Sequence, residues 1–143
     1  MKRHPTLIPL SRFHRSVLFV AQMAKKNGPK FKGYPTEVEG KAEYAYNFFL
    51  KSLEDHFKQE EEQLFPKIMG YTAELDALTK EVKAEHLQLS ALFLSIPEQE
   101  ELENHLDELG FALEAHVRKE ERQLFQLIQA TLDDDEMENL LIF

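Results

Sequence analysis

The chain has 143 residues, enough for one domain with a substantial core. Hydrophobic residues make up 43% and charged residues 30%, a balance typical of a globular protein rather than a disordered chain. Seventeen basic and 26 acidic side chains leave a formal net charge of −9, which argues against nucleic acids and anionic membranes as partners. Cysteine is absent, which excludes disulfides, thiolate metal sites and cysteine nucleophiles.

The first residues lack the continuous apolar stretch of a signal peptide. No run of the sequence approaches the ~20 apolar residues that a membrane helix needs. We therefore expect a cytoplasmic protein that binds neither membranes nor nucleic acids.

Leucine, glutamate, lysine and alanine dominate between clusters of proline and glycine, which favours helices over strands. The first predicted helix covers about residues 10–26, with Ser11 as its N-cap. The second opens with a capping box at Thr36 and Glu39 and continues to about residue 68.

Helix-breaking and helix-capping residues divide the rest of the chain. Pro66 is expected to kink the second helix or mark its last turn, and Gly70 suits its C-terminal cap. Thr72 caps a third predicted helix that ends near residue 94. Pro97 is placed in the first turn of a fourth helix, which runs to about residue 132.

Apolar residues recur in each predicted helix at the spacing of one helical face. Four amphipathic helices with short connections predict an all-α fold, an up-down-up-down four-helix bundle that forms a single domain over residues 1–143. The last stretch, residues 133–143, is acidic and then apolar, and is expected either to dock as a short helix or to fray.

Polar residues interrupt these apolar stripes in a regular way. Each stripe contains one histidine, and two stripes contain a glutamate four residues after it. The interrupting residues are His14, His56, Glu60, His86, His116 and Glu120. A buried carboxylate without a partner costs several kcal/mol, and no lysine or arginine lies on the stripes to offset two of them.

The spacing suits a pair of metal ions. Residues four apart face the same side of a helix, so each His-x-x-x-Glu pair presents a nitrogen and an oxygen to the interior. Imidazole and carboxylate together suit iron, manganese or zinc. We therefore predict a site for two divalent ions in the core.

An internal repeat supports a symmetric site. Residues 54–65 match residues 114–125 at an offset of 60, with identity at seven of 12 positions. Long predicted helices also alternate with shorter ones. The sequence therefore predicts two similar halves related by a pseudo-two-fold axis, with the site between them.

Several neighbouring residues have two interpretations. Glu61, Glu62 and Glu121 either face solvent or lie beside the ligands. Phenylalanines next to the ligands either exclude water from the site or serve as ordinary core; they are Phe57, Phe65 and Phe125. The two remaining histidines, His4 and His105, lie off the stripes and are expected on the surface.

The six residues, together with the EE-x-x-LF segments of the repeat, resemble the hemerythrin-like, HHE cation-binding family. The resemblance implies a four-helix bundle around two non-haem iron ions joined by an oxo or hydroxo bridge, with zinc or manganese as substitutes. It also implies that both glutamates bridge the irons, that His14 and His56 bind one iron, and that His86 and His116 bind the other.

The sequence departs from the oxygen-carrying members of that family. They place a second histidine four residues after the third-helix histidine, where this chain has Ser90, and an aspartate five residues after the last one. The remaining ligands leave one position open on each six-coordinate iron. Tyr44 or Tyr46, an acidic side chain or water are the candidates to fill one.

Three functions are compatible with this pattern. The first is a di-iron protein that senses or binds oxygen or nitric oxide, or that stores, repairs or donates iron. The second is a di-iron oxidase or peroxidase, and the third is a structural bundle that acts through protein contacts, for which residues 140–143 form an apolar end. We expect dioxygen, nitric oxide or peroxide as small ligands, and a monomer or a homodimer.

Overall fold

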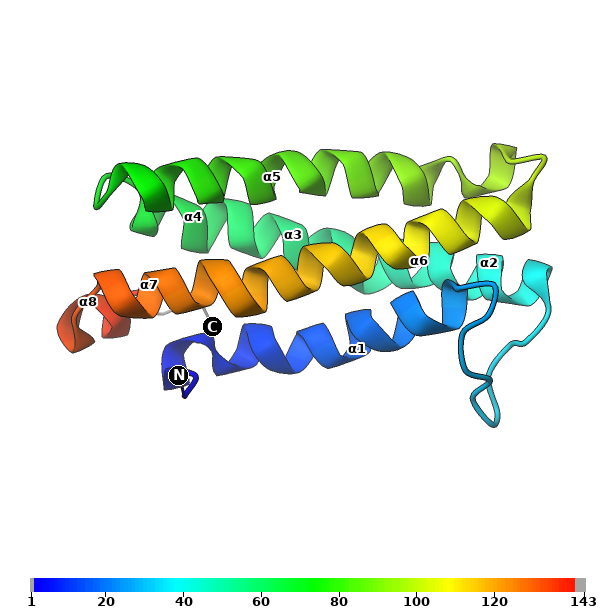
Figure 1. Cartoon of the computed structure of the whole chain (residues 1–143), viewed down its shortest axis with the longest axis horizontal. Helices are drawn as coiled ribbons and strands as arrows, with labels where there is room; N and C mark the ends of the chain where they lie inside the picture. Colours follow the sequence, from blue (N-terminus) through cyan, green and yellow to red (C-terminus); the bar gives the residue numbers. More distant parts are fainter. Residues whose placement is uncertain (1, 141–143) are drawn as a thin grey trace.

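A computed structural model describes residues 2–140, and they form helices and connecting turns without a strand (Figure 1). Four long helical runs lie side by side and alternate in direction, so the predicted all-α bundle is confirmed. The runs are α1 (Ile8–Ala24); α2 (Val38–Phe48), α3 (Glu54–Gln59) and α4 (Phe65–Ile68); α5 (Ala73–Leu94); and α6 (Leu102–Lys119) with α7 (Phe125–Thr131). A short helix, α8 (Asp134–Glu138), follows the last run.

Three π-helical turns join the helices within the second and fourth runs. They span Phe49–Leu53, Glu60–Leu64 and Glu120–Leu124. A π turn contains an extra residue and often marks a functional position in a helix. Two of these turns begin at corresponding positions of the repeat, at Glu60 and Glu120.

Helix α5 has the bounds that the sequence predicts for its third helix. It ends at Leu94, and at its start the Thr72 hydroxyl accepts a hydrogen bond from the Leu75 backbone N–H at 3.1 Å. The preceding run ends at Ile68, and Gly70 takes a positive φ of +91° just beyond it. Pro66 lies in the last turn of that run.

Three predicted helix starts are wrong. Helix α1 begins at Ile8, before Ser11, because Pro9 fits its first turn. The capping box at Thr36 does not form, because Glu37 is still extended and the helix begins at Val38. Pro97 lies in a separate 3-10 turn, and an extended Gln99 separates that turn from α6.

The end of the chain docks on the bundle as far as the structure describes it. Asp133 and Glu136 form a capping box at the start of α8. Met137 and Leu140 are buried, and the Lys67 ammonium donates to the Leu140 carbonyl at 3.0 Å. Residues 141–143, which complete the predicted apolar end, lie outside the described residues.

The core consists of two apolar clusters separated along the bundle axis. One cluster surrounds Phe49 and Phe93, near the connection between α1 and α2. The other surrounds Leu64 and Phe125, near the chain termini. Among residues 2–140, the buried polar and charged residues are the six predicted ones and Thr79.

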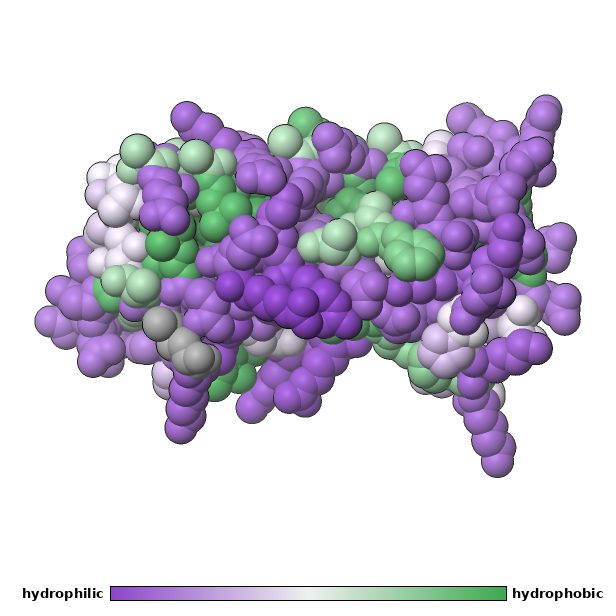
Figure 2. Space-filling view, in the orientation of Figure 1, coloured by the Kyte–Doolittle hydropathy of each residue, from purple (hydrophilic) through white to green (hydrophobic). Residues whose placement is uncertain are grey.

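The face of the molecule seen in Figure 2 is mainly polar. Figure 2 shows one face, on which hydrophilic side chains dominate and apolar side chains form small separate groups. In the stretch from residue 2 to residue 140, no helix combines the length and the apolar character required to cross a membrane.

Helices α1 and α6 approach each other closely at Gly110. A Cβ atom at this position would lie 2.6 Å from the Ala21 carbonyl oxygen, closer than non-bonded atoms allow. We predict that Gly110→Ala lowers the free energy of unfolding by about 1–3 kcal/mol, although alanine is the better helix former. Glu108→Ala, on the exposed face of the same helix, should change it by less than about 0.5 kcal/mol in urea denaturation. Equal stability of the two variants would contradict this close packing.

Candidate metal centre

The structure brings all six predicted residues together in one layer across the bundle. Each of the four helical runs contributes one histidine, and the second and fourth runs also contribute a glutamate. The histidine side chains are at most 4% exposed, and both glutamates are completely buried. The layer lies between the two apolar clusters, so all six groups have lost most of their contact with water.

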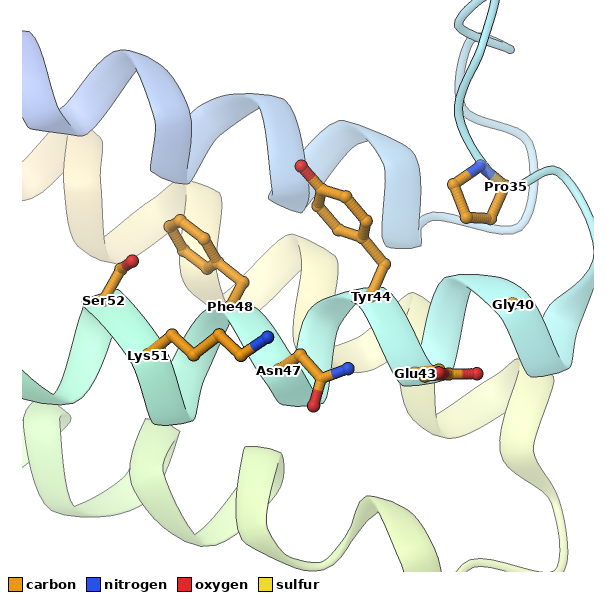
Figure 3. A pocket seen from close by; sticks show the side chains of 8 residues that line it. All are labelled: Pro35, Gly40, Glu43, Tyr44, Asn47, Phe48, Lys51 and Ser52. Carbon is orange, nitrogen blue, oxygen red and sulfur yellow. The ribbon is translucent and has the colours of Figure 1, made fainter.

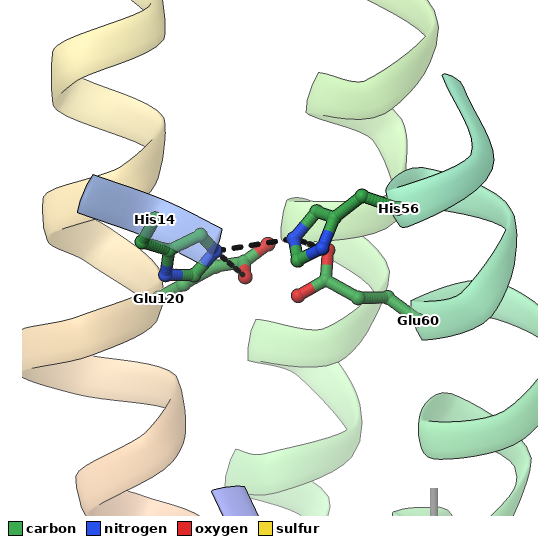
Figure 4. A group of neighbouring side chains, drawn as sticks. All are labelled: His14, His56, Glu60 and Glu120. Atoms are coloured by element: carbon green, nitrogen blue, oxygen red, sulfur yellow. Dashed lines mark hydrogen bonds and ion pairs between the residues drawn. The ribbon is translucent and has the colours of Figure 1, made fainter. Parts of the chain in front are cut away.

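One half of the layer contains His14, His56, Glu60 and Glu120, which Figure 4 shows pointing toward one another. One ligand atom from each of these residues lies within 4.8 Å of the others. Nε2 of His14 is 3.3 Å from a Glu120 oxygen and 3.3 Å from Nε2 of His56. Four groups of this kind fit around a single cation.

The other half contains His86 and His116 with the same two glutamates. Nε2 of His86 is 3.1 Å from a Glu60 oxygen, and Nε2 of His116 is 3.0 Å from a Glu120 oxygen. Because Glu60 and Glu120 belong to both halves, the arrangement describes two neighbouring cation positions with two shared carboxylates.

The polar atoms of this layer lack other partners. All four oxygens of Glu60 and Glu120, and Nε2 of His86 and His116, are buried without a hydrogen bond. Buried polar atoms are almost always paired, and an unpaired buried carboxylate is especially costly. No lysine or arginine is buried within residues 2–140. The donor set, imidazole nitrogen and carboxylate oxygen, therefore fits a pair of metal cations.

A second layer of carboxylates orients three of the rings. Nδ1 of His14 is 2.6 Å from Glu121, and Nδ1 of His86 is 2.8 Å from Glu61. Of the two interpretations of Glu61 and Glu121, the structure thus supports a place beside the ligands, whereas Glu62 is exposed. Such contacts leave Nε2 facing the centre of the layer and fix the orientation of the ring.

Sequence reasoning missed Glu85. Its carboxylate lies 2.8 Å from Nδ1 of His116, and the Lys119 ammonium holds it from the other side. Glu85 directly precedes His86 but bonds to His116 on the neighbouring run. Its position one residue before a candidate ligand was the only local signal, and that signal does not reveal the partner.

The predicted phenylalanines pack against the imidazoles. Phe57 stacks on His86 with ring centroids 4.0 Å apart, and Phe125 stacks on His14 at 5.7 Å. Phe65 also stacks on the His86 ring, with centroids 5.8 Å apart. These rings keep water away from the layer and, at the same time, belong to the apolar clusters.

The two remaining histidines, His4 and His105, lie outside the layer and keep part of their surface exposed, as predicted, although they are not free of contacts. Both are half-buried. His4 accepts the Thr6 N–H at the start of the chain, and the His105 ring bonds to the Leu92 carbonyl at 2.7 Å. They satisfy backbone groups at the two ends of the bundle, which their irregular spacing in the sequence does not indicate.

The two candidate tyrosines lie on α2 and do not reach the layer. Tyr44 packs among Phe19 and Tyr34, and it lines a groove of about 540 Å³ on the surface (Figure 3). Tyr46 packs against the apolar cluster at the far end from the termini. Ser90 is half-buried one turn beyond His86.

Two other grooves reach the outer edges of the site. One of about 510 Å³ touches His14 and Glu121, and one of about 440 Å³ touches His116 and Glu85. Neither is lined by Glu60 or Glu120. The grooves therefore end at the histidine rings instead of opening onto the carboxylates.

Burial and the neighbouring charges shift the pKa values of the residues in the layer. Burial opposes protonation of His14, but contacts with Glu120 and Glu121 outweigh it and raise the His14 pKa to about 10. Burial lowers the pKa of His56 to about 3. Burial, reinforced by the charge of Glu120, raises the pKa of Glu60 well above its ordinary value. Without a metal, protons must compensate the buried carboxylates.

The fold and the site together define a helical-bundle protein with a buried cation site. The family model of the Hemerythrin HHE cation binding domain matches residues 19–128, and the chain therefore belongs to this family. The match begins after His14, so the placement of this histidine in the site rests on the geometry described above. No curated protein and no solved structure matched the chain significantly.

The shifted pKa values predict how pH affects the chelator-treated protein. His14 titrates near 6.5 in an unfolded chain and near 10 in the fold, so its protonated form stabilises the fold fully below pH 6.5. This contribution is lost as pH rises toward 10. We predict a falling melting temperature over this interval, measured by circular dichroism. Metal-loaded protein should show little decline, because cations replace the protons. Equal declines in both forms would contradict the assignment.

Proposed function

We propose that this protein holds two iron ions and uses them to bind a small ligand, or to sense it, or to handle the iron itself. The observation that supports the proposal is the pair of buried four-residue groups that share Glu60 and Glu120, whose carboxylate oxygens have no hydrogen-bond partner. In this proposal His14 and His56 bind one ion, and His86 and His116 bind the other.

The number of ligands favours iron over zinc. Each position offers two imidazoles and an oxygen from each of two shared carboxylates. An oxo or hydroxo bridge between the ions would make five donors, one more than the tetrahedral set that zinc usually adopts in structural sites. A six-coordinate iron would keep one position for an external ligand. Manganese and zinc are expected to bind as substitutes.

The access to the layer supports a small ligand such as dioxygen, nitric oxide or peroxide. The grooves end at the outer edges of His14 and His116, and phenylalanine rings pack against the imidazoles. An organic substrate would need a cavity that reaches the carboxylates. We therefore place binding, sensing or iron handling ahead of an oxidase or peroxidase, and ahead of a bundle that acts only through protein contacts.

Gas binding can be tested on protein loaded with ferrous iron under anaerobic conditions. We expect dioxygen and nitric oxide each to change the ultraviolet and visible absorption spectrum of the loaded protein. Free ferrous iron at the same concentration, in the same buffer, provides the baseline. A spectrum that neither gas alters beyond this baseline would contradict gas binding and leave iron handling as the function.

Substitution of the shared carboxylates tests the site itself. Glu60→Ala and Glu120→Ala should each lose bound metal, because each removes a ligand from both positions. Glu62→Ala is the matched control, because Glu62 is exposed two residues from Glu60. His105→Ala should keep its metal and lose only about 1 kcal/mol of stability with its hydrogen bond to Leu92. Equal metal content in all four variants, measured by plasma mass spectrometry, would refute the assignment.

A further inference from the structure

The internal repeat predicts two equal metal positions, and one pair of contacts obeys that symmetry. Glu61 and Glu121 occupy equivalent places in the repeat. Each bonds to Nδ1 of the histidine on the neighbouring unrepeated helix, at 2.8 Å for His86 and 2.6 Å for His14. One histidine in each half is therefore oriented by a carboxylate.

The other two histidines break the symmetry. Nδ1 of His116 is 2.8 Å from Glu85, the residue before His86. The residue before His14 is Phe13, and its ring stacks on His56 with centroids 4.4 Å apart. Within the described part of the chain, Nδ1 of His56 has no hydrogen-bond partner. Phe13 therefore packs on the face of the His56 ring, where it can offer no hydrogen bond to Nδ1, whereas Glu85 bonds to Nδ1 of His116 in the other half.

Glu85 is itself held in place. Lys119, one turn beyond His116 on the same run, donates to Glu85 and also to Glu81 at 2.7 Å. The carboxylate is therefore fixed by an ammonium on one side and an imidazole on the other. No comparable group bonds to Nδ1 of His56, whose ring packs against Phe13 and His14 and has its polar contacts at Nε2.

A carboxylate on Nδ1 fixes the tautomer of a histidine and makes Nε2 a better donor to a metal, and its loss typically weakens metal binding by about 10- to 100-fold. We propose that the two metal positions differ in affinity. The position of His86 and His116 fills first and retains its ion, whereas the position of His14 and His56 fills second and exchanges it. Glu85 and Lys119 are the positioning residues behind this difference. The inference rests on the proposed two-metal function and deepens it toward iron handling.

A stepwise arrangement gives the protein a stable form with one ion bound. The retained ion would keep a positive charge beside both shared carboxylates, so that the core stays neutralised while the second ion leaves. Each position lies beside a groove, the exchanging one beside the groove that touches His14 and the retained one beside the groove that touches His116, so access does not distinguish them. Uptake and release of one metal ion per chain would then need no unfolding of the bundle.

Zinc, which is diamagnetic, is the probe for the order of filling. Side-chain nitrogen NMR signals of the four histidines are recorded on metal-free protein as zinc is added. After one equivalent, we expect the signals of His86 and His116 to have shifted and those of His14 and His56 to shift only with the second. Simultaneous movement of all four signals, or movement of His14 and His56 first, would overturn the inference.

Competition with a chromophoric zinc chelator measures the two affinities. Glu85→Gln should weaken the tighter step by about 10- to 100-fold and bring the two steps together. Glu81→Gln is the matched control, because Glu81 also pairs with Lys119 but touches no histidine. An unchanged tighter step in Glu85→Gln, or the same loss in Glu81→Gln, would overturn the inference.

The two proposals fail in different ways. Two zinc ions bound with equal affinity by the unsubstituted protein would overturn the inequality of the positions and leave the two-metal site intact. Binding of no zinc and no iron would overturn the proposed function, and the inference with it.

Discussion

The structure depends on one electrostatic constraint, which is that two carboxylates with no buried lysine or arginine beside them lie fully buried in the centre of a helical bundle. Glu60 and Glu120 expose no surface, and none of their oxygens has a hydrogen bond. Packing cannot offset such a cost, because apolar neighbours make the loss of hydration worse. Only protons or metal cations can neutralise these groups where they lie. The four imidazoles around them determine which cations fit.

The rest of the fold is arranged around this layer. Two apolar clusters close the bundle above and below it, and phenylalanines from both clusters lie against the imidazoles. Outside the layer, three carboxylates orient histidine rings: Glu61, Glu85 and Glu121. Two of them form ion pairs with basic side chains, Glu121 with Arg3 and Glu85 with Lys119. Acidic and basic groups therefore alternate outward from the centre, an arrangement that would let an acidic protein hold a cationic cofactor without a buried lysine or arginine.

The helical spacing of apolar residues predicted most of the fold and all six residues of the layer. The six residues stood out because each interrupts an apolar stripe, and a stripe fixes the direction of a side chain relative to its own helix. The same logic fails for contacts between helices. Glu85 and Phe13 occupy similar sites before a histidine, but what each touches depends on how the runs pack. Local signals also misplaced two helix starts, at Ser11 and Thr36. The first helix begins earlier because Pro9 fits its first turn, and the second begins later because Glu37 is still extended. His105 is half-buried because its ring bonds to the Leu92 carbonyl near the end of α5. The spacing of residues along the sequence does not reveal such a contact.

The central claim is that metal cations, and not protons alone, neutralise the buried carboxylates. Plasma mass spectrometry of aerobically purified protein, combined with protein quantification, tests this claim most directly. The account predicts about two iron ions per chain, one for each of the two buried His/Glu groups. A protein that contains no metal, and that takes up none after anaerobic loading with ferrous iron, would show that the His/Glu layer is a structural polar network and would contradict the account.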